Sequence, residues 1–288
     1  MPVITTALSP SIIGLVLLAA VLHAVWNALV KIGGDRLIVL ASVNLVGALF
    51  GLLIIGFVEP PKPESWMYLF LSTLFHNAYY FFLLNSYRVG ELSQVYPLAR
   101  GSAPLMVLAG SAWIAGEYLP GLATAGVVIA SLGITSVIFE GGAPWRRDPR
   151  PVGFALMTGA WIASYTVVDG IGVRLSGSPL GYIGWLFFID GLPIALVAIF
   201  RRRMQIVVYL RTEWKYCVGG GLASIGAYGL VIYAMSTGSM AAVSALRETS
   251  VIIAAVIGTL FLHEQFGARR ILAACTVVVG IGLIQATH

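Results

Sequence analysis

Charged residues are scarce in this chain: Asp, Glu, Lys and Arg make up 10% of its 288 residues, whereas hydrophobic residues make up 59%. A soluble domain carries roughly 25% charged residues, so a water-soluble core cannot account for this composition. The two cysteines, Cys217 and Cys275, both lie in apolar runs. They indicate neither a disulfide framework nor a metal site, and no cofactor is expected.

Several signatures of other protein classes are also missing. The chain has no GxxxxGK[ST] phosphate-binding loop, no HExxH and no GxSxG, so the sequence supports neither an ATP-driven pump nor an enzyme. The formal net charge of +5 does not predict nucleic-acid binding, because the basic residues fall between apolar runs. The first charge, Lys31, follows the first apolar run, so we expect a permanent membrane span there rather than a cleaved signal peptide.

Long apolar runs dominate what is present. A run of about 20 apolar residues is what a helix needs to cross the hydrocarbon core, and continuous runs of this length exclude the alternating strands of a membrane barrel. The longest polar stretches, 141–150 and 201–215, are too short for a domain, and the first is expected to be a linker. Spans are predicted at 11–30, 37–58, 66–87, 92–115, 119–139, 151–173, 179–200, 213–236, 240–262 and 267–286.

The predicted loops divide the basic residues unequally. On the side that carries both termini, only Lys62 and Arg174 are found, whereas thirteen lie on the other side. The positive-inside rule therefore predicts that both termini lie on the periplasmic side. The thirteen are Lys31, Arg36, Arg88, Arg146, Arg147, Arg150, Arg201, Arg202, Arg203, Arg211, Lys215, Arg269 and Arg270.

The two halves of the chain, 1–143 and 144–288, match each other at near-constant offsets. Each half has five predicted spans, and an odd number forces the second half to enter the membrane in the opposite direction. We therefore expect an all-α membrane protein with ten transmembrane helices, arranged as two inverted five-helix repeats around a central cavity. Trp66, Tyr68, Leu74, Tyr80 and Gly90 recur 148 residues later as Trp214, Tyr216, Leu222, Tyr228 and Gly238. Arg100, Glu117, Gly133 and Ile134 recur 147 later as Arg247, Glu264, Gly280 and Ile281, and Gly14, Trp26 and Asn27 correspond to Gly153, Tyr165 and Thr166 at 139.

Each half also closes on a Glu followed by an apolar span that ends in Gly–Ile: GEYLPGLATAGVVIASLGI from Gly116 and HEQFGARRILAACTVVVGI from His263. With the duplication, this pattern resembles the drug/metabolite transporter superfamily, specifically its ten-span EamA-type branch, and within it the YddG-like exporters of aromatic and other neutral amino acids. The resemblance implies a cavity between the halves, alternating access and a bacterial inner-membrane location. Members are often drawn with cytoplasmic termini, and the charge distribution of this chain disagrees.

Polar side chains inside spans are costly in lipid and usually face a cavity or another helix. In the first span, His23, Trp26 and Asn27 share one helix face. The amide of Asn27 suits a substrate carboxylate or ammonium, or alternatively an interhelical hydrogen bond. His23 could carry a proton or be structural.

The third span places His76, Tyr79 and Tyr80 on one face near its centre. An interfacial aromatic belt favours helix ends, so this position predicts a cavity wall. Tyr228, the repeat mate of Tyr80, would line the same cavity from the other half.

The fourth and ninth spans each contain an arginine. Tyr96 lies four residues before Arg100, and Arg247 is followed by Glu248 and preceded by Ser244. The arginines could capture a substrate carboxylate or form ion pairs at a gate, or their side chains could snorkel to the headgroups.

The sixth span carries Trp161, Tyr165 and Asp169 on one face. The aromatic pair could stack on a planar substrate or pack as core. Asp169 is near the end of the span and is expected to be solvated or paired. Glu117 and Glu264 end the fourth and ninth spans and are expected to be structural.

The sequence as a whole predicts a secondary transporter that exports small metabolites, and it favours amino acids, including aromatic ones, as the cargo. The expected partners are this small-molecule substrate and the lipid bilayer, with no nucleic acid. A monomer would suffice, and an oligomer is not required. A cargo of another kind, such as a cationic drug or a nucleotide sugar, is the alternative, and a membrane scaffold or intramembrane enzyme is a remote one. Proton coupling and facilitated diffusion both stay open. The predicted substrate-binding residues are Trp26, Asn27, His76, Tyr79, Tyr80, Tyr96, Arg100, Trp161, Tyr165, Tyr228 and Ser244, and the gate or coupling candidates are His23, Asp169, Arg247 and Glu248.

Overall fold

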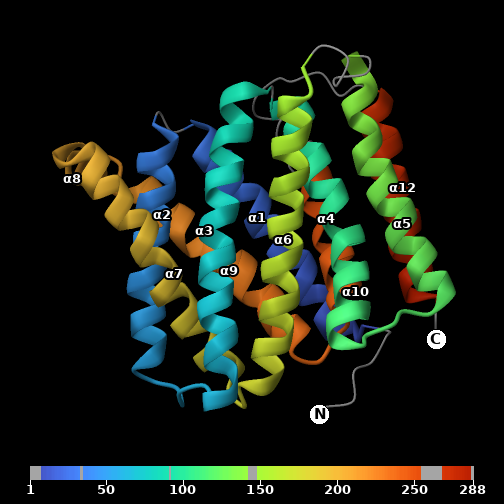
Figure 1. Cartoon of the computed structure of the whole chain (residues 1–288), viewed down its shortest axis with the longest axis horizontal. Helices are drawn as coiled ribbons and strands as arrows, with labels where there is room; N and C mark the ends of the chain where they lie inside the picture. Colours follow the sequence, from blue (N-terminus) through green and yellow to red (C-terminus); the bar gives the residue numbers. More distant parts are fainter. Residues whose placement is uncertain (1–7, 33–34, 91, 142–147, 254–267, 287–288) are drawn as a thin grey trace.

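The computed structural model describes residues 8–32, 35–90, 92–141, 148–253 and 268–286, and the regular elements in these ranges are helices. The long helices run side by side along the bundle axis (Figure 1). They are α1 (Pro10–Ile32), α2 (Arg36–Ile55), α3 (Trp66–Val89), α4 (Leu92–Ala115), α5 (Gly121–Ser136), α6 (Arg150–Leu175), α7 (Pro179–Arg202), α9 (Trp214–Met235) and α12 (Ala268–Gln285). The short elements are η1 (Pro63–Ser65), η2 (Val137–Gly141), α8 (Met204–Thr212) and α10 (Met240–Arg247).

The apolar runs became membrane-length helices with the expected boundaries to within a few residues. In the described ranges, eight helices, α1 to α7 and α9, are long and apolar enough to cross a membrane, and α12 adds a shorter apolar stretch, Ile271–Gln285. The ninth predicted span is interrupted: α10 ends at Arg247, the chain turns at Glu248, and residues 249–253 are helical again. The rest of that span lies outside the described residues, so the count of ten remains a prediction.

The stretch 201–215 differs from the prediction of a polar connection, because it contains the helix α8. Arg203, with φ of 47°, interrupts the helical conformation between α7 and α8. The short apolar run IVVY inside α8 buries Ile206 against a small cluster that includes Ile38 and Ile194. The sequence did not predict this helix, because its apolar segment is far shorter than a membrane span and charged residues flank it.

Helix pairing agrees with the predicted repeat. The most extensive packing joins α2 to α7, α5 to α12, α3 to α6, α4 to α6 and α1 to α9. Under the predicted offsets, α3 corresponds to α9 and α6 to α1, so α3–α6 and α1–α9 are equivalent pairs. A twofold relation between the halves would produce this pairing, and the inversion itself stays a prediction.

Glycine permits the closest of these approaches. A Cβ added at Gly126 of α5 would meet the carbonyl oxygen of Gly280 in α12, and one added at Gly280 would meet the oxygen of Gly126. Backbones in a membrane approach this closely where side chains are small.

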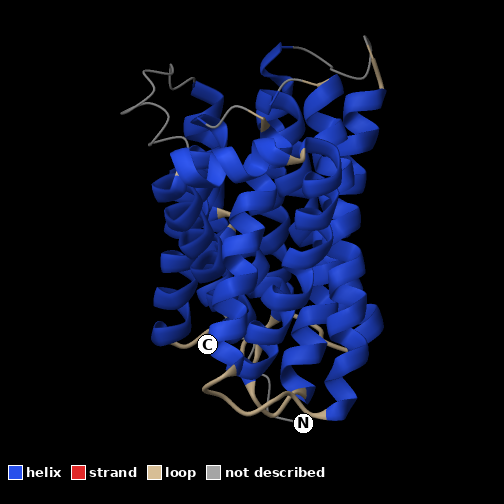
Figure 2. Cartoon of the chain, turned by 90° about the vertical axis from the view of Figure 1, so that its left-hand side faces the viewer, coloured by secondary structure: helices blue, strands red, loops and turns tan. Residues whose placement is uncertain are grey.

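The two ends of the bundle differ. The larger hydrophobic core lies where α1 begins and α12 ends, here called the packed end (the lower end in Figure 2), and it includes Leu69, Val173, Met235 and Met240. The opposite end, here called the basic end, carries the described residues Arg88, Arg150, Arg201, Arg203 and Arg211 at helix termini or in α8.

Candidate functional site

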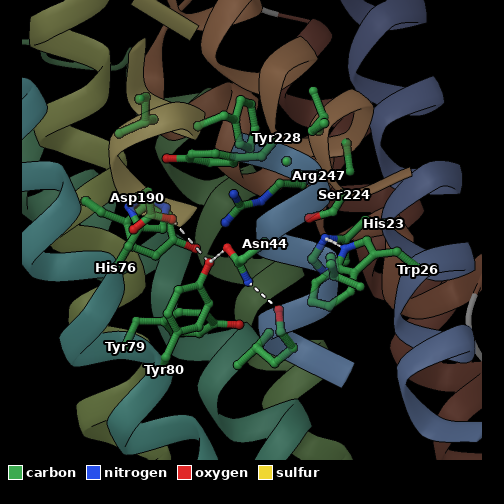
Figure 3. A pocket seen from close by; sticks show the side chains of 18 residues that line it. His23, Trp26, Asn44, His76, Tyr79, Tyr80, Asp190, Ser224, Tyr228 and Arg247 are labelled. Carbon is green, nitrogen blue, oxygen red and sulfur yellow. Dashed lines mark hydrogen bonds between the residues drawn. The ribbon is translucent and has the colours of Figure 1, made fainter. Parts of the chain in front are cut away.

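A cavity lies between α1, α2, α3, α6, α7, α9 and α10, near the middle of the bundle (Figure 3). Its empty volume is about 750 Å³, counting the space that opens to solvent. Both halves of the chain contribute to its wall. Its polar and aromatic lining consists of His23, Trp26, Asn44, His76, Tyr79, Tyr80, Tyr165, Asp190, Ser224, Tyr228 and Arg247.

A second cavity of about 350 Å³ shares His23 and Tyr79 with the first. It adds Tyr87 near the end of α3 and Tyr96 near the start of α4, together with Asn27. The last turns of α3 and the first turns of α4 lie toward the basic end, so the second cavity lies nearer that end than the first. The packed end is filled by the core instead.

Aromatic rings from three helices form one wall of the central cavity. The rings of His76 (α3) and Tyr165 (α6) are stacked, with centroids 3.9 Å apart and planes 16° apart. Tyr228 (α9) meets both edge-on, at 5.3 and 5.4 Å, and Tyr79 meets Tyr165 edge-on at 5.7 Å. A wall of this kind can pack against a planar or apolar side chain.

The arginine of the fourth span is neutralised inside the protein rather than at the headgroups. The Nε atom of Arg100 lies 2.8 Å from Oε2 of Glu248, and the two side chains are 5% and 1% exposed. Nη2 of Arg100 also donates to Ser250 at 3.3 Å. The chain turns at Glu248, which brings Glu248 and Ser250 to Arg100 from the interrupted ninth span.

Three polar residues of the central cavity, Asn44, Asp190 and Ser224, are absent from the sequence prediction. The hydroxyl of Tyr80 is 2.9 Å from Oδ1 of Asn44 and 3.3 Å from Oδ2 of Asp190, and Asn77 donates to Oδ1 of Asp190 at 3.4 Å. Asp190 is a single polar residue in the apolar run FFIDGLP, and Asn44 stands in the mostly apolar run VNLVG. The cost of polar groups in lipid was the available signal, and it applies to isolated residues as well as to clusters.

Toward the packed end, a buried carboxylate joins three helices. Asp169 of α6, with no exposed surface, accepts from Tyr182 of α7 at 2.9 Å and from Tyr228 of α9 at 2.6 Å. It is therefore paired by hydroxyl groups rather than by a cation.

A second buried network lies at the packed end itself. Glu117, just after α4, forms an ion pair with Arg174 at 2.9 Å and accepts from the backbone N–H of Met240 at 2.7 Å. Arg174 also donates to the backbone oxygens of Met235 and Gly238, at 2.9 and 2.8 Å. Together they hold the turn between α9 and α10. Glu264, the repeat mate of Glu117, lies outside the described residues.

Most predicted site residues line the two cavities, and four do not. Trp161 packs against Phe75 and Phe82, at 5.4 and 6.3 Å between ring centroids, because its side of α6 meets α3. Ser244 is fully buried in α10, and Asp169 and Glu248 are held in the contacts above. Those that line a cavity are His23, Trp26, Asn27, His76, Tyr79, Tyr80, Tyr96, Arg100, Tyr165, Tyr228 and Arg247. Within the described ranges, no three His, Cys, Asp or Glu side chains come together as a metal site.

Comparison with known proteins finds a family match for the second half of the chain. Residues 150–286 match the EamA-like transporter family, and this segment lies within the second predicted repeat. No curated protein matches the chain. Among solved structures 28 chains match, and one of them, described as "Crystal structure of protein", covers 96% of both chains at a TM-score of 0.74 and 18% identity. At this identity the likeness shows a shared fold over nearly the whole chain.

Proposed function

We propose that this protein is a secondary transporter that exports small metabolites, with amino acids, including aromatic ones, as its substrates. The match of residues 150–286 to a transporter family supports transport of a small molecule. The observation that carries the substrate class is the aromatic wall of His76, Tyr165 and Tyr228 in a mid-bundle cavity.

The difference between the two ends supports a direction. If the basic end faces the cytoplasm, as the positive-inside rule predicts, the two cavities lie on the cytoplasmic side of the packed core, which separates them from the periplasm. An exporter must bind its substrate from the cytoplasmic side before it releases the substrate outside. Rocking of the inverted halves would then close the basic end and open the packed end, so that access alternates. In this proposal the protein resides in a bacterial inner membrane with periplasmic termini.

The charges around the cavity bear on the alternative cargoes. A nucleotide sugar carries phosphate groups, which proteins bind with several Arg or Lys side chains, whereas among the described residues Arg247 is the one basic Arg or Lys side chain that lines the central cavity. A cationic aromatic compound is the second candidate function, because the carboxylate of Asp190 lines the same cavity.

The test is transport by the purified full-length protein in liposomes. We expect protein-dependent counterflow of labelled tryptophan and leucine. Tyr165→Ala removes the stacking partner of His76 and should lower tryptophan transport about tenfold, since aromatic pairs contribute about 0.5–1.5 kcal/mol beyond their buried area. Phe70→Ala is the matched control, because Phe70 is an aromatic residue of α3 that is 58% exposed on the outside of the bundle.

Absence of counterflow for every neutral amino acid tested, with protein that elutes as a folded species, would show that the substrate class is wrong. Equal loss of activity in Phe70→Ala and Tyr165→Ala would remove the argument from the aromatic wall.

A further inference from the structure

Arg247 is a buried cation without a full set of partners. Its side chain is 3% exposed, and in the part of the chain that the structure describes, its Nε and Nη2 atoms have no hydrogen-bond partner. The carboxylate of Glu248 is 3.9 Å from Nε of Arg247, beyond hydrogen-bond distance, because it pairs with Arg100 at 2.8 Å. A buried donor without an acceptor is costly, and a charged one more so.

The position of Arg247 makes these donors available to a ligand. It is the last residue of α10, at the interruption of the ninth span, and it lines the central cavity. Figure 3 shows its guanidinium pointing into the space between Asn44, Asp190 and Tyr228. The guanidinium carbon lies 5.9 Å from the ring centre of Tyr228, which contributes a cation–π contact but accepts no hydrogen bond from the free N–H groups.

Asp190 supplies a carboxyl group to the same cavity. It is 5% exposed and lines the same cavity from α7. Its hydrogen bonds come from neutral groups, Tyr80 at 3.3 Å and Asn77 at 3.4 Å, and both are long. Among the described residues Asp190 takes part in no ion pair.

Because both charges border one cavity, we propose that Arg247 and Asp190 are the two poles of a single site that selects zwitterions. The substrate carboxylate binds the guanidinium of Arg247, and its ammonium binds Asp190, with Oδ1 of Asn44 nearby as a further acceptor. The substrate side chain then lies against the wall of His76, Tyr165 and Tyr228. This inference rests on the proposed function and specifies which ends of the substrate are recognised.

Electrostatics gives the reason for selectivity. A zwitterion gives each pole a partner of opposite charge. An amine without a carboxylate leaves Arg247 unpaired, and an acid without an ammonium leaves Asp190 unpaired. A site that leaves a buried polar group without its partner rejects the analogue strongly, by far more than the loss of a methylene would cause.

The experiment compares three ligands that share an indole ring: tryptophan, tryptamine, which lacks the carboxylate, and indole-3-propionate, which lacks the ammonium. Binding to the purified full-length protein is measured by competition against labelled tryptophan or, where tryptophan does not bind, by ligand-induced thermal stabilisation. For the wild type we expect tryptophan to bind about a hundredfold more tightly than either analogue.

Single substitutions should relax one preference each. Arg247→Gln should bring tryptamine level with tryptophan while indole-3-propionate stays weak. Asp190→Asn should do the reverse. Arg247→Lys, which keeps the charge, should retain most of the preference for tryptophan over tryptamine, and Asp148→Asn, a neutralisation in the exposed pair with Arg150, should change nothing.

The outcomes separate this inference from the proposed function. If the wild type binds tryptophan but the analogues bind equally well, or if Arg247→Gln and Asp190→Asn weaken all three ligands alike, the two-pole site is wrong and amino-acid transport stands. If the wild type binds no amino acid, the proposed function fails; tight tryptamine binding that depends on Asp190 would then identify a cation transporter. Should Arg247→Gln fail to fold, Arg247→Lys and Asp190→Asn still decide the matter, since each predicts its own analogue ratio.

Discussion

Replacing Glu117 tests whether the network at the packed end stabilises the structure. The ion pair of Glu117 with Arg174 is almost completely buried, with side chains 4% and 9% exposed. Glu117→Ala leaves the guanidinium of Arg174 without its carboxylate and the N–H of Met240 without its acceptor. Glu117→Gln removes the charge but keeps an oxygen that can accept from Met240.

The magnitude follows from burial. Removing one partner of a buried ion pair costs about 3–5 kcal/mol, whereas an exposed pair contributes about 0–1 kcal/mol. Arg174 keeps its bonds to the oxygens of Met235 and Gly238, so we expect a loss near the lower limit, about 3 kcal/mol, for Glu117→Ala. Glu117→Gln should lose less, and Asp148→Asn, in a pair whose side chains are 34% and 74% exposed, should lose under about 1 kcal/mol.

Equilibrium unfolding in mixed micelles would measure these free energies, and a double-mutant cycle of Glu117→Ala with Arg174→Ala would isolate the pair. Neighbouring groups in one network typically couple by about 0.5–3 kcal/mol, and we expect more than about 1.5 kcal/mol here because both side chains are buried. A coupling below about 0.5 kcal/mol, or equal losses for Glu117→Ala and Asp148→Asn, would refute the reasoning.

Two further predictions concern helix packing and the buried carboxylate. Gly126→Ala and Gly280→Ala should each destabilise the protein by about 1–3 kcal/mol, because the new methyl group would meet the backbone oxygen of the facing helix; unchanged unfolding free energies would contradict this close approach. Tyr182→Phe and Tyr228→Phe each remove one hydrogen bond to Asp169 and should each cost about 1–3 kcal/mol. Only Tyr228 lines the cavity, so transport assays on variants of equal expression should find the larger defect in Tyr228→Phe, and equal transport by both would oppose a role for its hydroxyl.

The sequence located the helices well and the partners of polar residues poorly. The boundaries of α3 and α6 were predicted to within two residues, because apolar length sets a membrane span. His76, Tyr79 and Tyr80 were predicted as one cavity-lining face from their spacing, and all three line the central cavity. Trp161, at the same spacing from Tyr165, packs against α3 instead.

Asp190 and Asn44 show why the rest could not be predicted from spacing. Neither has a polar neighbour three or four residues away within its apolar run, so no helical periodicity marks the face that it occupies. The pairing of Arg100 with Glu248 likewise depends on the turn that interrupts the ninth span. This ion pair joins two side chains that lie in different halves of the chain.

By itself, the sequence determined that this is a bundle of membrane-length helices with matching halves, since the length of apolar runs and the recurrence of Trp, Tyr, Arg and Glu are properties of the chain alone. Only the tertiary structure decided which faces line the cavity, which end is packed, and which charged side chains lack a hydrogen-bonded counter-ion. The physical reason is that lipid tails and protein interiors are equally apolar. A membrane helix therefore carries little sequence contrast between its inner and outer faces, and neighbouring helices determine which one borders the cavity.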